Sequence, residues 1–151
     1  MTKNLKVLVE LVIDEAKKLR EYATQDERDS LNFDTLLPTN QASCIYGQMT
    51  GYCYSREALN LIRKCALRVY DTKKYDLNAN SVKHLNGEPK NLEVPDARCG
   101  LYHSPIEVFI IVMAEHDNPN YQNNNKVLID YLKGKTDTLE FNFKRAKKKL
   151  V

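Results

Sequence analysis

A capped apolar run in the second half of the chain is the feature that most constrains the fold. Residues 106–113 read Ile-Glu-Val-Phe-Ile-Ile-Val-Met, apolar on all sides apart from Glu107. A segment without a polar face must be covered all round, so the other elements have to pack about it. Ser104 is a favoured N-cap, Pro105 suits the first helical position, and Glu107 can complete a capping box. These signals favour a buried central helix, while the many β-branched side chains favour a buried strand as the alternative.

Helical signals recur along the rest of the chain. Apolar residues three and four positions apart predict a long first helix. Ser55 is a good N-cap for a later helix whose apolar face includes Cys65, and Gly134 is a stop signal for another. We therefore expect a mainly α, bundle-like single domain of five or six helices spanning 1–151. The further helices are predicted over residues 3–23, 26–33, 56–70 and 119–133, and either a helix or a strand near 139–150.

Two segments lack helical periodicity. Residues 39–54 are predicted to form an ordered irregular loop or hairpin, because their glycines permit turns and their bulky side chains gain from burial. We expect this loop to lie beside residues 99–103 at one end of the molecule. Residues 71–100 are polar and are interpreted as an irregular, partly mobile insertion. Asn86-Gly87 favours a small β-hairpin there, with residues 82–85 and 92–94 pairing and residues 88–91 in its loop.

The charge balance points to no particular partner. Among 151 residues, 23 Lys and Arg against 20 Asp and Glu give a formal charge of +3, which is weak for nucleic-acid binding. Basic residues gather at the end of the chain, in 144–151, and are interpreted as a solvated helix end, with a phosphate- or partner-binding tail as the alternative. Abundant Asn, with far more Lys than Arg, suggests an AT-rich bacterial, phage or mobile-element genome.

The expected compartment is the cytoplasm. No apolar stretch has the length of a membrane span, and Glu10, Asp14 and Glu15 interrupt the apolar residues near the N-terminus, so no signal-peptide core forms. In the cytoplasm the four cysteines are expected to be reduced. Glycine-rich phosphate-binding and dinucleotide motifs are missing from the sequence, and we expect no cofactor.

One hypothesis for the chemistry is a cysteine nucleophile used for acyl transfer or hydrolysis. Cys44 would supply the thiolate and His103 the base, since a thiol needs a base to react efficiently at neutral pH. Glu107, or Asp117, would orient the imidazole. Gln41 would donate to an oxyanion. Whether the chain is an enzyme is left open, and this hypothesis is the less favoured one.

A metal site is a second hypothesis. Cys44, Cys53, Cys99 and His103 would make a tetrahedral set of zinc ligands. Their spacing is irregular and matches no zinc module, so we predict no metal. Cys65 is assigned to the core, because it lies on an apolar helix face.

A binding surface is the hypothesis we favour. Tyrosine combines a large apolar ring with a polar tip, which suits it to interfaces. We therefore predict a recognition module that binds a protein or small ligand, with homo-oligomer formation left open. Basic residues at 56, 63, 64 and 68 also allow weak nucleic-acid binding, which is not favoured. The predicted ligand-binding residues are Tyr46, Gln48, Tyr52, Cys53, Tyr54, Arg56 and Tyr102.

Overall fold

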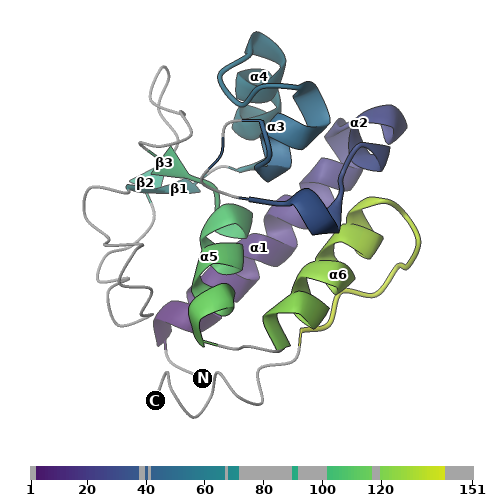
Figure 1. The fold of residues 1–151 in the computed structure, drawn as a ribbon. Helices are drawn as coiled ribbons and strands as arrows, with labels where there is room; N and C mark the ends of the chain where they lie inside the picture. Colours follow the sequence, from purple (N-terminus) through teal and green to yellow (C-terminus); the bar gives the residue numbers. More distant parts are fainter. Residues whose placement is uncertain are drawn as a thin grey trace.

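Three helices form the centre of the fold, which we describe from a computed structural model. It describes residues 3–37, 40, 42–66, 68–71, 90–91, 102–116 and 120–141. Helices α1 (Lys3–Tyr22), α5 (Pro105–His116) and α6 (Asn120–Leu132) pack against one another, with α1 behind the other two in Figure 1. The domain is mainly helical, as predicted.

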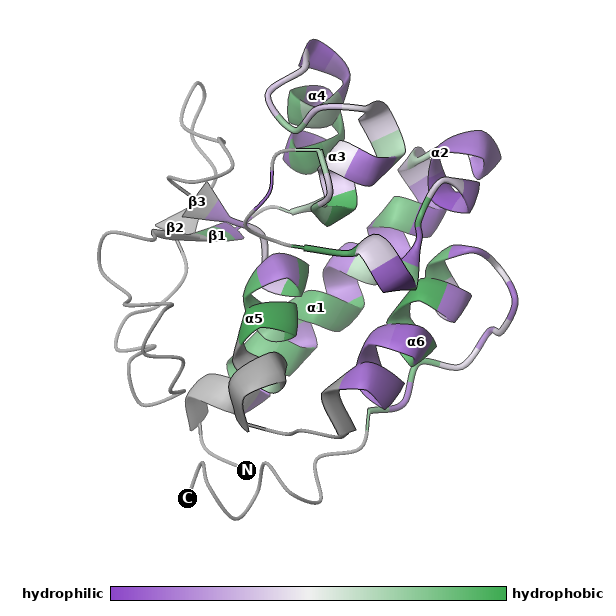
Figure 2. Cartoon of the chain, viewed as in Figure 1, coloured by the Kyte–Doolittle hydropathy of each residue, from purple (hydrophilic) through white to green (hydrophobic). Residues whose placement is uncertain are grey.

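Helix α5 is the buried central helix that its capping residues indicate, and the strand alternative is wrong. The Ser104 hydroxyl accepts the backbone N–H of Glu107 at 3.3 Å, and the Ser104 carbonyl accepts that of Val108 at 3.0 Å. Residues 105–110 are all buried. Figure 2 shows the described turns of α5 as mostly hydrophobic, whereas α1 and α6 carry more hydrophilic stretches. The N-cap outweighs β-propensity because helices α1 and α6 supply the cover that this apolar segment needs.

Short helices surround this centre. Helix α2 (Gln25–Asp29) begins with a capping box in which the Thr24 and Glu27 side chains bind each other's backbone N–H groups. The helix predicted to reach residue 33 ends at Asp29, and a 3-10 turn, η1 (Phe33–Thr35), follows after a break. The prediction was therefore correct for the existence of this helix and wrong for its end.

The prediction of an irregular segment over 39–54 is wrong for its middle part. Helix α3 (Ile45–Thr50) lies there, with Cys44 as its N-cap; the Cys44 Sγ accepts the backbone N–H of Gly47 at 3.3 Å. Gly51 ends the helix in the left-handed region, at φ 92°. A helix of six residues has fewer than two turns, so its pattern contains too few positions to show a period.

The helix predicted over 56–70 ends earlier than expected. Ser55 does cap α4 (Arg56–Cys65), by accepting the N–H of Ala58 at 3.1 Å. Ala66 leaves the helical region, and the chain continues as strand β1 (Arg68–Asp71). Strand β1 exists because two distant segments pair with it.

Those two segments are β2 (Lys90–Asn91) and β3 (Tyr102–His103), and both are antiparallel to β1. The sheet order is β2-β1-β3, and the sheet lies on the side of α5 away from α6 (Figure 1). The predicted pairing of 82–85 with 92–94 lies outside the described residues. Residues 90–91, expected in the hairpin loop, are instead a strand that pairs with Arg68 and Val69.

The segment after α6 closes the core. Gly134 follows the helix with φ 81°, as its role as a stop signal predicts. Residues 136–141 are not helical, so the predicted helix does not begin there, and residues 142–151 lie outside the described part. The Phe141 ring packs on Phe109 of α5, with 4.7 Å between the ring centroids. Among the described helices, none has the length and apolar character needed to cross a membrane.

Replacing Gly51 with alanine should destabilise the protein by about 1 kcal/mol, because an L side chain disfavours the left-handed region. A Cβ at this position meets no atom within 4 Å, so the loss comes from backbone conformation and not from a clash. Urea unfolding measures the change. Gly51→Asn should lower the free energy of unfolding by less, since asparagine tolerates the left-handed region. A Gly51→Ala protein as stable as the wild type would contradict this explanation.

Candidate functional site

A buried carboxylate lies where α1, α3 and α5 meet. Glu15 of α1 is only 1% exposed and follows the same helix face as Val12, Ala16 and Leu19, all fully buried. In the sequence, Glu15 is one of the acidic residues that interrupt the N-terminal apolar run, and it was not predicted to be a site residue. Its spacing from Val12 and Leu19 was a signal that this acid lies on the buried face.

The Glu15 carboxylate receives hydrogen bonds from two other elements. Its Oε1 accepts the backbone N–H of Ile106 at 2.9 Å, and its Oε2 accepts the Tyr46 hydroxyl. Ser104 adds a side-chain hydrogen bond. Ile106 is the second residue of α5, so an acid on α1 satisfies one of the N–H groups that an α-helix leaves unpaired at its start.

Burial decides the protonation of this group. The pKa of Glu15 is raised from its ordinary value of 4.5 to about 7, chiefly by removal from water and to a smaller extent by the nearby charge of Glu107. The hydrogen bonds from Tyr46, Ile106 and Ser104 act in the opposite direction. Burial also raises the pKa of Tyr46 well above its ordinary value, so this hydroxyl keeps its proton.

A histidine–glutamate pair lies beside this carboxylate. The His103 Nδ1 and the Glu107 Oε2 are 3.0 Å apart, and both side chains are about 95% buried. Glu107 was predicted to orient His103, and the two side chains are in contact. This arrangement holds the imidazole in one orientation, as a general base requires.

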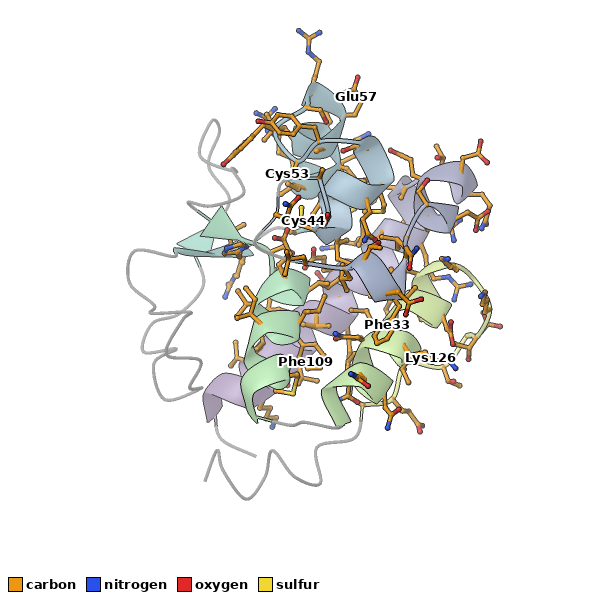
Figure 3. The ribbon with its side chains drawn as sticks, viewed as in Figure 1. Phe33, Cys44, Cys53, Glu57, Phe109 and Lys126 are labelled. Atoms are coloured by element: carbon orange, nitrogen blue, oxygen red, sulfur yellow. The ribbon has the colours of Figure 1, made fainter. Side chains whose placement is uncertain are left out.

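Three cysteine thiols are buried in the described part of the chain. Cys44, Cys53 and Cys65 are each at most 1% exposed, and none is in a disulfide. Figure 3 shows Cys44 and Cys53 at the end formed by α3 and α4, above the start of α5. Burial raises the pKa of Cys65 to about 12, with a contribution from the charge of Glu15. Cys65 is a core residue, as predicted.

Other members of the predicted catalytic and metal sets lie outside the described residues. These are Gln41, Cys99 and Asp117. Within the described part, no three His, Cys, Asp or Glu side chains form a group that could hold a metal ion.

The predicted ligand-binding residues separate into buried and exposed ones. Tyr46 is fully buried against Glu15, and Cys53 is buried. The Gln48 amide is used internally, since it binds the backbone of Asn32 at both its oxygen and its nitrogen.

Exposed contact area remains at the connection between α3 and α4. Tyr52 is 46% exposed, Tyr54 is partly buried, and Arg56 is exposed. We call these three residues the tyrosine edge. Tyr102 lies in β3, and the structure describes its backbone only.

The buried carboxylate should make stability depend on pH. The folded-state pKa of Glu15 is raised, so its contribution is greatest below pH 4.5 and is lost as the pH rises through 7. Compared with Glu15→Gln, the wild type should lose about 3 kcal/mol of unfolding free energy between pH 4 and pH 8. Urea unfolding across this range measures the difference. Glu10→Gln, an exposed position on α1, is the control, and a difference that is constant with pH would contradict the assignment.

The buried cluster thus joins the Glu15 carboxylate of α1, the Tyr46 phenol of α3, and a pair formed by His103 of β3 and Glu107 of α5. This buried cluster is part of the protein interior, whereas the tyrosine edge is exposed to solvent. Comparison of the chain with protein-family models, with curated proteins and with solved structures gives no match.

Proposed function

We propose that this chain is a small recognition module that binds a polypeptide partner through the tyrosine edge. The observation that carries the proposal is the half-exposed Tyr52 ring, which makes a T-shaped contact with Tyr54 at 5.3 Å between ring centroids. Aromatic rings with polar tips contribute a large share of binding energy at protein interfaces.

The backbone beneath these rings is held by several contacts. Gly51 ends α3 on one side and Ser55 caps α4 on the other. Between them, Cys53 is buried in the core and Tyr54 packs against it. A surface ordered before binding loses less conformational entropy on association, which supports a binding role for this edge.

Arg56 suggests the chemistry of the partner. It is exposed, and within the described residues its guanidinium is in no ion pair. A guanidinium two residues along the chain from Tyr54 suits a carboxylate flanked by apolar side chains. We therefore expect an acidic peptide segment as the partner, and we place the interaction in the cytoplasm, which the thiol state of Cys44, Cys53 and Cys65 supports.

Selection from a random peptide library on the immobilised protein tests this proposal. The enriched peptides should contain Asp or Glu next to an apolar residue, and Tyr52→Ala should weaken their binding at least tenfold, measured by fluorescence polarisation. Tyr22→Ala is the matched control, because Tyr22 is 48% exposed, lies beside Lys64 and is not part of the tyrosine edge. Equal binding by both variants, or no enriched peptide, would rule the proposal out.

A second candidate function, thiol-dependent acyl transfer or hydrolysis, is supported by the contact between His103 and Glu107. Cys44 would be the nucleophile, although its sulfur accepts a backbone hydrogen bond and is fully buried.

This second candidate predicts that iodoacetamide alkylates Cys44 faster than Cys53 near pH 6.5, because an adjacent base would generate thiolate. Peptide mass spectrometry measures both rates in one sample, so Cys53, which is equally buried, reports the opening of the fold. His103→Gln should slow the reaction at Cys44 only. Equal, slow labelling of the two cysteines would exclude the nucleophile.

A further inference from the structure

A cavity of about 580 Å³ lies on a different part of the molecule from the tyrosine edge. One wall is the segment from the end of α2 through η1, and the other is α6 with the turn that follows it. Figure 3 shows Phe33 on the first wall and Lys126 on the second. The partly exposed Phe33 ring gives the cavity some apolar surface, whereas Leu31 and Ile129, which also line it, are buried.

The two walls carry opposite charges. Asp29 and Asp34 give the α2–η1 wall a formal charge of −2. The three lysines and one aspartate of the α6 wall give it +2, since +3 and −1 are combined. The residues of the α6 wall are Lys126, Asp130, Lys133 and Lys135.

These charges are not neutralised by one another across the cavity. Within the described residues, no ion pair involves any of the six charged side chains that line it. Asp29 accepts a hydrogen bond from the neutral amide of Gln25. Opposite walls of unlike charge produce a field across the cavity, and a bound dipole is stabilised when it aligns with that field.

We propose that this cavity binds a zwitterionic ligand of the amino acid or short-peptide class. The ligand's carboxylate lies toward Lys126 and Lys133, and its ammonium group lies toward Asp29 and Asp34. An apolar side chain of the ligand packs on Phe33, which the volume accommodates. This site shares no residue with the tyrosine edge, so its test is independent of the test of the proposed function.

Titration of the full chain with the dipeptide Ala-Phe, followed by ¹H–¹⁵N NMR, tests this proposal. Amide signals of residues 29–34 and 126–135 should shift saturably, with a Kd on the order of 10⁻⁴ to 10⁻³ M, as expected for a few charged contacts. N-acetyl-Ala-Phe, which lacks the ammonium group, and Ala-Phe-amide, which lacks the carboxylate, should each bind at least fivefold more weakly. Unsaturable shifts, or equal binding by either blocked dipeptide, would overturn the zwitterion assignment.

Charge-removing variants assign each wall its role. Lys126→Gln and Lys133→Gln should weaken binding of Ala-Phe at least fivefold and leave binding of Ala-Phe-amide unchanged, because the amide has no carboxylate to lose. Asp34→Asn should weaken binding of Ala-Phe and leave binding of N-acetyl-Ala-Phe unchanged, because the N-acetyl dipeptide has no ammonium group. Lys17→Gln, at an exposed position of α1 outside the cavity, is the matched control. Equal affinities for Lys17→Gln and Lys133→Gln would contradict the proposal, and the NMR spectrum of each variant verifies its fold.

Discussion

The hydrogen bonds accepted by the Glu15 carboxylate hold three elements of this protein together. One oxygen accepts from the first turn of α5, and the other accepts from Tyr46 of α3. A buried acceptor of this kind is stable only while its donors remain in place, since an unsatisfied buried polar group costs about 1–3 kcal/mol. The positions of α3 and the start of α5 relative to α1 therefore depend on one side chain.

The surface features follow from this internal arrangement. With Tyr46 drawn inward, α3 packs on α4, and the short connection between them leaves Tyr52 at the surface. The charged cavity arises separately, where α2 and η1 meet α6. The tyrosine edge, proposed to bind a peptide, and the charged cavity, proposed to bind a small zwitterion, share no residue.

Much of the helical framework could be predicted from local signals. The N-caps Ser55 and Ser104 and the stop at Gly134 lie where the structure has them. Errors occur where a local signal is short or is overruled by distant pairing. Helix α3 is too brief to show a period, and β1 follows α4 because β2 and β3 pair with it. At the candidate site, the contact between Glu107 and His103 was predictable because the two residues are four positions apart. The burial of Tyr46 and the hydrogen bonds between Gln48 and Asn32 were not predictable, because they join separate segments.

By itself, the amino-acid sequence determined where most helices begin and which segment must be central, because caps and apolar periodicity act over a few neighbouring residues. Only the tertiary structure decided that Glu15 is a buried acid with a pKa near 7, because its donors Tyr46 and Ile106 are 31 and 91 positions away along the chain. The sheet and the charged cavity were also decided by the tertiary structure. Each joins segments separated by tens of residues, and desolvation and the field between charges depend on distance in space and not on distance in sequence.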